Sequence, residues 1–191
     1  MKTTPLRFGI VFLLGFALLM GAFELSRGTA FERFVVEDLI LVPTTAAINV
    51  ITPSEHVTLV GRTIASPGGA NLRVTRGCEG IEMFLLLAAA ILAFPAATAR
   101  HRFMGLAIGG VVAYVLSVTR LIALHYTLRY SPTAWEALHG LLLPLGPIVL
   151  LALYFLHWSA AGRADEPQKD AHQGVGPQRQ GAIDRGRVPG A

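Results

Sequence analysis

Charged residues and cysteine are both scarce in this chain of 191 residues. Only 15% of its residues are charged, and Cys78 is its one cysteine. A single cysteine cannot form an internal disulfide or a thiol redox pair, and no Cys/His spacing resembles a zinc site. The net charge of +4 comes from basic residues scattered over loops and a tail, without the basic stripe that nucleic-acid binding needs. We therefore expect no metal, no cofactor and no nucleic-acid partner.

Hydrophobic residues are abundant instead, at 53%, and they come in long blocks. About 20 apolar residues cross the hydrocarbon of a membrane, so the blocks predict an all-α, polytopic membrane helix bundle. We expect one membrane-embedded domain over residues 1–163, with membrane lipid as a partner. The block at residues 8–23 also has the length of a signal-peptide core, but the nearest small-residue site lies well beyond it, which favours an uncleaved span. The four expected spans are residues 8–23, 81–97, 103–118 and 140–158.

A long segment with polar flanks, residues 24–77, separates the first two spans. From Phe31 to Val50 its apolar residues recur at helical spacing, with Glu37 and Asp38 on the other side. This pattern predicts an amphipathic helix that lies in the membrane interface, bent or ended by Pro43. A helix over residues 31–52 that spans the membrane instead is the open alternative.

Two short β-type runs, residues 57–60 and 71–75, flank strong turn residues at 66–69 and predict a small exported β-hairpin. Residues 120–138 read as a polar connector, in which Ser131 and Pro132 signal a helix start. Residues 164–191 are rich in Gly, Pro, Gln and charge and have no apolar period, so we expect a disordered cytoplasmic tail.

The distribution of Lys and Arg sets the expected orientation, because cytoplasmic flanks carry the excess of positive charge. With four spans, both chain ends and the loop between the second and third spans share one side. The basic residues that mark this side as cytoplasmic are Lys2, Arg7, Arg100, Arg102, Arg163 and Lys169. The starts of the second and fourth spans and the end of the third then lie together at the outer face.

Cys78 stands between Gly77 and residues 79–80 at the start of the second apolar run. One interpretation is a small buried side chain, which free cysteine usually is. The other is a nucleophile, because a helix N-terminus and nearby cations favour the thiolate. The N–H groups of Glu79 and Gly80 would then be available as an oxyanion hole. The carboxylates of Glu79 and Glu82 oppose a thiolate unless they are paired.

Arg120 and His139 are the basic residues expected on the same side as Cys78. An arginine at the edge of a span is costly and is often functional, although snorkelling to the interface is the alternative. Histidine activates a thiol and protonates a leaving amine. Arg129 and His125 are the rival arginine and histidine, and we rank both lower.

Two glutamates complete the candidate site. Glu136 precedes His139 by one helical turn, where it can orient the ring. Glu82 lies one turn past Cys78 and is expected to face the bundle, mainly as an ion-pair partner of Arg73, Arg76 or Arg120, with substrate binding as the minor alternative.

These features together resemble the exosortase/archaeosortase family, most closely its short H-type members. They are the glycine-flanked cysteine that opens a span, the Ala-Phe-Pro-Ala end of that span at residues 93–96, Arg120 at the end of the next span, and His139 after it. The resemblance covers residues 8–158. It implies a membrane cysteine peptidase or transpeptidase in the cytoplasmic (inner) membrane, with its active site facing the periplasm or exterior.

By this resemblance, Cys78 is the nucleophile and Arg120 and His139 are the essential arginine and histidine. The implied partners are exported proteins that end in a short motif, a hydrophobic span and a basic cluster. Ser117 stands three residues before Arg120, where the family often has asparagine, and with Glu82 and Glu136 it is a candidate for substrate binding. The alternative function is a non-catalytic membrane scaffold or a small transporter subunit, in which Cys78 only fills space.

Overall fold

The computed structural model describes residues 5–75 and 77–164, most of them in helices. Of the predicted tail, residues 165–191 lie outside this part of the chain. Four helices are long and apolar enough to cross a membrane: Leu6–Leu25, Ala30–Ile51, Ala99–Tyr130 and Pro132–Gly162. The chain therefore has the character of a multi-pass membrane protein, as its composition predicts.

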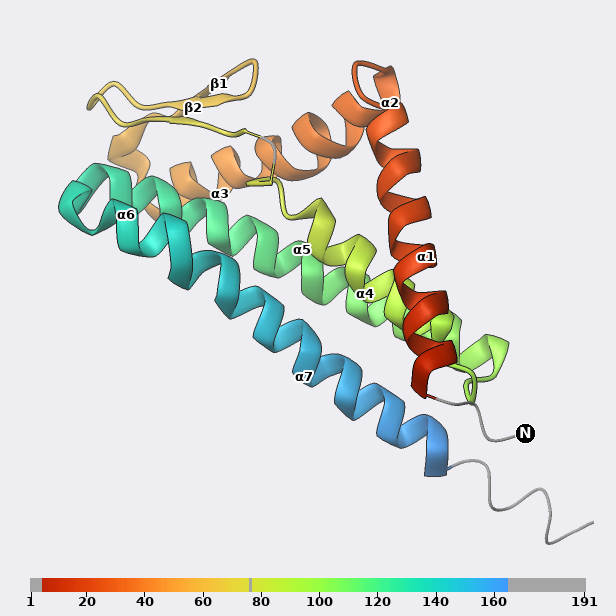
Figure 1. Cartoon of the computed structure of the whole chain (residues 1–191). Helices are drawn as coiled ribbons and strands as arrows, with labels where there is room; N and C mark the ends of the chain where they lie inside the picture. Colours follow the sequence, from red (N-terminus) through yellow and green to blue (C-terminus); the bar gives the residue numbers. More distant parts are fainter. Residues whose placement is uncertain (1–4, 76, 165–191) are drawn as a thin grey trace, which may run out of the picture.

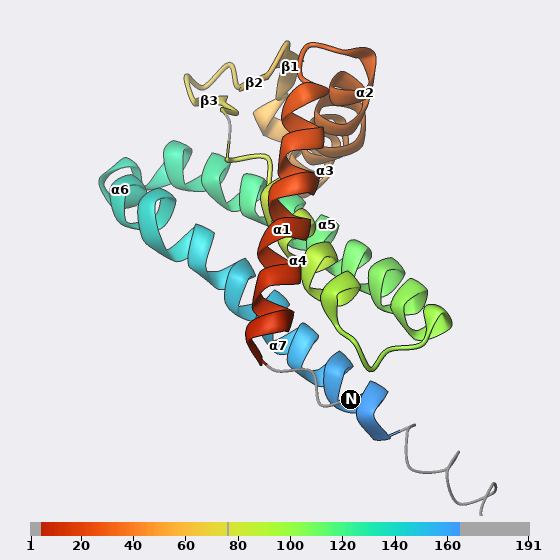
Figure 2. The ribbon, with the colours of Figure 1, turned by 45° about the vertical axis from the view of Figure 1, so that its right-hand side comes forward.

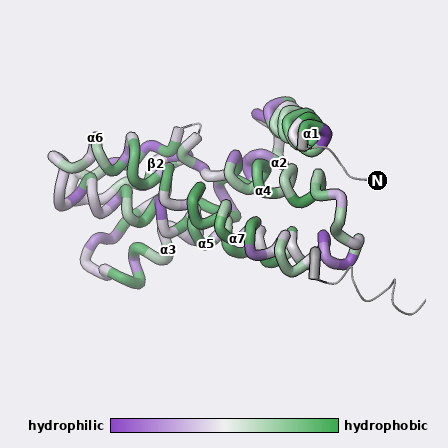
Figure 3. The backbone as a smooth tube through the Cα atoms, turned by 60° about the horizontal axis from the view of Figure 1, so that its bottom comes forward, coloured by the Kyte–Doolittle hydropathy of each residue, from purple (hydrophilic) through white to green (hydrophobic). Residues whose placement is uncertain are grey.

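Large apolar side chains on the outside of these helices support this conclusion. On α1 (Pro5–Leu25), Leu18 is 74% exposed and Leu13 is 62% exposed, and α7 (Leu143–Ala164) exposes Leu153 and Leu156 in the same way. Exposed apolar area on this scale is costly in water, so lipid is its natural surrounding. Figure 3 shows hydrophobic residues along most of α1, α4, α5 and α7.

The set of long helices differs from the four expected spans at one place. Helix α4 (Ile81–Ala93) has 13 residues and ends at Ala93, with Phe94 as its C-cap ahead of Pro95. At 1.5 Å per residue it is about 20 Å long, which is less than the roughly 30 Å of a bilayer's hydrocarbon core. The prediction that one helix spans the membrane over residues 81–97 is therefore wrong. The long apolar helix that the sequence analysis did not count as a span is Ala30–Ile51.

This helix, called the crosswise helix below, consists of α2 (Ala30–Arg33), the π-helical stretch η1 (Phe34–Leu41) and α3 (Val42–Ile51). Pro43 does not end it. A proline removes one N–H and clashes with the carbonyl four residues earlier, and the wider turns of η1 precede it. The helix has the length and composition of a span, yet it runs crosswise to α1 at the end of the molecule that carries the sheet (Figures 1 and 2).

Helix α5 (Ala99–Tyr130) is longer than the span predicted at residues 103–118. Half of the expected polar connector is thus the continuation of one 32-residue helix. After Ser131 the chain turns through η3 (Pro132–Ala134), α6 (Trp135–Ala137) and the π-helical stretch η4 (Leu138–Leu142) into α7. The helix start predicted at residues 131–132 is confirmed.

The small sheet has three antiparallel strands in the order β1-β2-β3, not the two of the predicted hairpin. They are β1 (Thr58–Val60), β2 (Thr63–Ala65) and β3 (Asn71–Arg73). The predicted turn at residues 66–69 joins β2 to β3, where Gly69 N–H donates to the Ser66 carbonyl at 2.9 Å. A tight turn through Gly61 and Arg62 pairs β1 with the strand that the sequence pattern missed.

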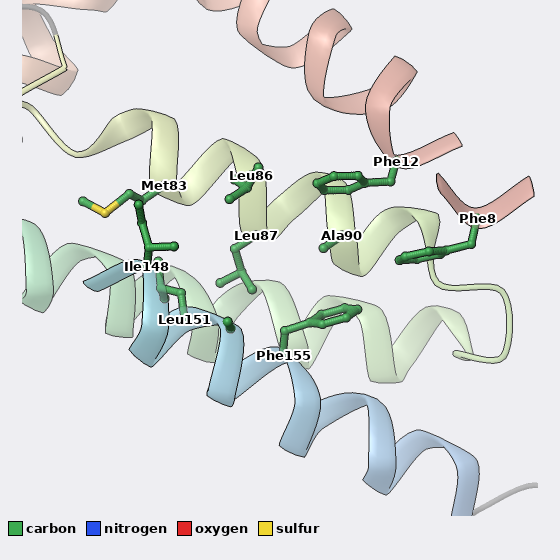
Figure 4. A pocket seen from close by; sticks show the side chains of 10 residues that line it. Phe8, Phe12, Met83, Leu86, Leu87, Ala90, Ile148, Leu151 and Phe155 are labelled. Atoms are coloured by element: carbon green, nitrogen blue, oxygen red, sulfur yellow. The ribbon is translucent and has the colours of Figure 1, made fainter. Parts of the chain in front are cut away.

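The buried side chains form two cores. One, around Ile40, Ile64 and Leu121, joins the crosswise helix, the sheet and the second half of α5. The other, around Leu87, Ala113 and Trp158, joins α4, α5 and α7. Beside the second core, a cleft of about 240 Å³ between α1, α4 and α7 is lined only by apolar side chains, including Phe12, Ala90 and Phe155 (Figure 4).

The two ends of the molecule differ. The start of α1, the α4–α5 connection and the end of α7 lie together at one end (Figures 1 and 2). There, His101 stacks on Trp158 with ring centroids 4.6 Å apart, and the Trp158 indole donates to the His101 carbonyl. The crosswise helix, the sheet, the start of α4 and α6 gather at the opposite end.

Candidate active site

The loop at residues 77–80 leads from the sheet into α4 and carries Cys78. Its two glycines both have positive φ, +79° at Gly77 and +80° at Gly80, a conformation that only glycine adopts without strain. At Gly80 there is a second constraint, because a Cβ would lie 2.2 Å from Oγ and 2.9 Å from Cβ of Ser117. The loop thus packs directly on α5, and the glycines determine where the thiol stands.

Cys78 and His139 meet across the site, although they lie far apart in the sequence. The Cys78 Sγ is 3.5 Å from His139 Nε2, and the Thr75 hydroxyl lies 3.8 Å from the same sulfur. His139 sits in the widened turn of η4, and π-helical turns of this kind often occur at functional sites. This distance permits proton transfer between the thiol and the imidazole.

Trp135, which the sequence analysis did not select, orients the imidazole. Its ring stacks on that of His139 with centroids 4.9 Å apart and planes 9° from parallel. Glu136 is exposed and makes no hydrogen bond to His139, so its expected role in orienting the ring is wrong. The signal that could have identified Trp135 is its position four residues before His139 on a helix, where two side chains are neighbours.

Arg120 lies behind the thiol loop. It is 7% exposed, and its NH1 donates to the carbonyl of Gly77 at 3.3 Å. Its Nε is buried and has no hydrogen-bond partner among the described residues. Within residues 5–75 and 77–164 the guanidinium also has no carboxylate partner, whereas Arg27, Arg62 and Arg129 at the same end are all paired with glutamates.

A buried cation without an anion is costly. It is the arrangement expected where negative charge arrives only with a substrate or develops during a reaction.

Ser117 and Glu82 stand differently from one another. Ser117 is buried, donates to the carbonyl of Ala113 at 2.9 Å and contacts Gly80, so it forms the wall behind the thiol loop. Glu82 is half-buried and forms no ion pair with any described residue, which rules out the expected pairs with Arg73 and Arg120. Arg76, the third expected partner, lies outside the described residues.

The carboxylate next to the thiol is the one that is paired. Glu79 is completely buried, and its Oε1 accepts from Arg62 NH1 at 3.4 Å. Burial raises the pKa of the Glu79 carboxyl above its ordinary value, while the charge of Arg62 opposes this rise. Arg62 was not selected from the sequence, because the strand that follows it, β2, was not predicted.

Backbone N–H groups are also available near the sulfur. The Cys78 N–H donates to the Thr75 carbonyl at 3.0 Å. Those of Glu79 and Gly80 make no hydrogen bond to any residue that the structure describes. These are the two donors that the sequence analysis proposed for an oxyanion hole.

The rival residues His125 and Arg129 belong to a separate network around Glu55. Arg129 donates to Glu55 at 3.2 Å and to the Gly68 carbonyl at 3.1 Å, so it is held in place and not simply solvated. His125 is completely buried, 3.9 Å from Glu55. Hydrogen bonds from Ser66 and Tyr130, together with Arg129, lower the pKa of Glu55 from 4.5 to about 2. This network fastens the sheet to α5 and does not include Cys78.

An apolar groove of about 400 Å³ runs from the site along α4 and α5. Gly80 and Ser117 line one part of it, and Phe31, Phe84 and Gly110 line the rest, with further residues from α1, η1 and α5. The groove therefore begins within two residues of the thiol. The cleft in Figure 4 starts deeper, at Met83.

Comparison of the chain with protein-family models, with curated proteins and with solved structures finds no match.

Proposed function

We propose that this chain is a membrane-embedded cysteine peptidase or transpeptidase of the exosortase/archaeosortase kind. It cleaves C-terminal sorting signals of exported proteins at the outer face of the cytoplasmic membrane. The observation that carries the proposal is a Cys78–His139 pair 3.5 Å apart next to the buried Arg120, which has no carboxylate partner among the described residues. Filler cysteines do not need a histidine at hydrogen-bonding distance and an uncompensated cation behind their backbone.

The proposed chemistry gives each of the three groups a defined role. His139 takes the thiol proton, and the Cys78 sulfur attacks the carbonyl carbon of the scissile peptide. The Arg120 guanidinium, with the N–H groups of Glu79 and Gly80, stabilises the negative oxygen of the tetrahedral intermediate. The C–N bond then breaks, and His139 returns its proton to the leaving amine. Water or an acceptor amine attacks the thioester and frees the sulfur.

The apolar groove supports the choice of substrate class. A sorting signal carries its own hydrophobic span directly after the recognised motif, so the span must lie beside the protein in the membrane. The groove offers an apolar wall that includes Gly80, two residues after Cys78, and Ser117, which packs on the thiol loop. Glu82, half-buried and unpaired within the described chain, stays the candidate for contact with the substrate's polar motif.

The orientation rests on the distribution of basic residues. Arg7, Arg100 and Arg102 belong to the helix ends opposite the Cys78 loop. By the positive-inside rule this end is cytoplasmic, and the thiol is then external. Because Cys78 is the sole cysteine, a membrane-impermeant maleimide applied to intact cells tests this directly. Labelling only after permeabilisation would contradict the orientation.

The activity is tested by co-expression with a membrane protein that ends in a motif, an apolar span and a basic cluster. Cys78→Ser and His139→Ala are expected to abolish processing at unchanged protein levels. His157→Ala is the matched histidine control, because His157 is exposed on α7 at the other end of the molecule and should leave processing intact. Unchanged processing in Cys78→Ser would favour the scaffold or transporter alternative.

A further inference from the structure

The carboxylate of Glu79 presents a problem for a reactive thiol next to it. The side chain is completely buried, and within the described chain its Oε2 has no hydrogen-bond partner. An uncompensated negative charge on the neighbouring residue disfavours the thiolate, which is the attacking species. Whatever neutralises Glu79 therefore affects the chemistry of Cys78.

Arg62 is the group that neutralises it. This residue lies in the turn between β1 and β2, and its NH1 is 3.4 Å from Glu79 Oε1. The same guanidinium lies 2.8 Å from Glu32 and 3.7 Å from Glu37 on the crosswise helix. One side chain from the sheet thus joins the crosswise helix to the thiol loop.

The surrounding charges do not replace this contact. Arg27 is 3.6 Å from Glu32 and acts on Glu79 only at longer range. Glu82 and Glu32 add negative potential to Glu79. On the other side, Cys78 faces His139 and the Thr75 hydroxyl, and Arg120 is directed to the Gly77 carbonyl. Arg62 is the one cation within 4 Å of the Glu79 carboxylate in the part of the chain that the structure describes.

We infer that Arg62 is a positioning residue for Cys78: by binding Glu79 it compensates the negative charge beside the thiol and fixes the loop that presents the sulfur. The small sheet is then part of the site, although it contributes no group that touches the sulfur. The inference deepens the proposed function. Its readout is the reactivity of the thiol, so it holds or fails separately from peptide cleavage.

The test uses the full chain in lipid nanodiscs and measures the rate at which iodoacetamide alkylates Cys78 between pH 6 and pH 9. Arg62→Gln is expected to slow alkylation at pH 7 about tenfold, because the buried carboxylate of Glu79 is left uncompensated. Arg62→Lys keeps the charge and should stay within about threefold of the parent. The matched control is Arg73→Gln, which removes the same charge from an exposed site on the same sheet and should have little effect.

The double variant Arg62→Gln/Glu79→Gln separates charge from structure. Without the carboxylate, the loss of Arg62 should no longer matter, and alkylation should return to within about threefold of the parent. Glu79→Gln alone should be as fast as the parent or faster, and this measurement does not depend on Arg62→Gln folding. An unchanged rate in Arg62→Gln, a double variant as slow as Arg62→Gln, or a tenfold loss in Glu79→Gln would each overturn the inference.

Discussion

Replacement of Gly80 by alanine tests the contact that holds the thiol loop against α5. At φ +80° an alanine costs about 1–2 kcal/mol, because its Cβ crowds the following carbonyl. The new Cβ would also lie 2.2 Å from Oγ and 2.9 Å from Cβ of Ser117. The hydroxyl can rotate, but the Cβ is fixed to α5, so overpacking adds about 1–3 kcal/mol. We expect a loss of about 2–5 kcal/mol in the free energy of unfolding.

Two further variants separate these contributions. Gly77→Ala has the same backbone strain, with φ +79°, but a Cβ there meets nothing within 4 Å. It should cost only about 1–2 kcal/mol. Gly80→Ala/Ser117→Gly removes the clashing atoms, so the double variant should be about 1–3 kcal/mol more stable than the sum of the single changes predicts. Ser117→Gly alone costs roughly 0.3–0.5 kcal/mol through its helix propensity.

The assay is SDS-induced unfolding of the purified chain in mixed micelles, followed by circular dichroism. Alkylation of Cys78 in the folded state reports whether the loop itself has moved. Equal losses in Gly77→Ala and Gly80→Ala, or strict additivity of Gly80→Ala with Ser117→Gly, would refute the reasoning that the loop packs on α5.

Three other outcomes are expected. Trp135→Ala should reduce processing about 2–10-fold, and Trp135→Phe should reduce it much less, because a stacked ring pair is worth about 0.5–1.5 kcal/mol and holds His139 in place. Equal activity in both variants would contradict this role. Gly110→Leu, which fills the groove along α4 and α5, should block processing, whereas Ala90→Leu in the cleft of Figure 4 should not. Co-expression with a substrate measures both. The pKa of Glu55 is about 2 in the folded chain and 4.5 in the unfolded chain. Its contribution to the free energy of unfolding is therefore complete above pH 4.5 and is lost as the pH falls towards 2. Glu55→Gln should flatten the pH dependence of the free energy of unfolding in this window.

Most of the helical architecture could be predicted from the sequence, because long apolar runs are the strongest signal a membrane protein carries. Helix ends were less predictable. Apolar residues continue to Ala97, but Pro95 ends α4 early. Helix α5 continues through polar residues such as Arg129, which bonds to Glu55, just before the sheet, and to Gly68, in the turn between β2 and β3. The end of α4 follows from a local signal, Pro95. The end of α5 depends on tertiary contacts, which a local pattern does not contain.

The candidate site was also predicted only in part from the sequence. The meeting of Cys78 with His139 follows from topology, since both stand at the same end of their apolar runs, and their roles stay predictions. Trp135 and Arg62 were missed for different reasons. Trp135 looked like an ordinary interfacial aromatic, and Arg62 reaches Glu79 only through a strand pairing that no periodicity indicates. Glu136 was overvalued because neighbouring positions on a helix do not ensure a contact.

The length of α5 has a consequence for what can be cut. Its 32 residues rise about 48 Å, more than the roughly 30 Å of hydrocarbon in a bilayer. Under the proposed function, α5 crosses the lipid and also carries Ser117 and Arg120, which contact the thiol loop, so it sets the height of the sulfur above the lipid. Helix α5 then determines how far from the membrane a substrate is cut. Each residue inserted between the scissile bond and the membrane anchor of a substrate moves that bond up to about 3.3–3.6 Å further out, so a few insertions should carry it beyond reach.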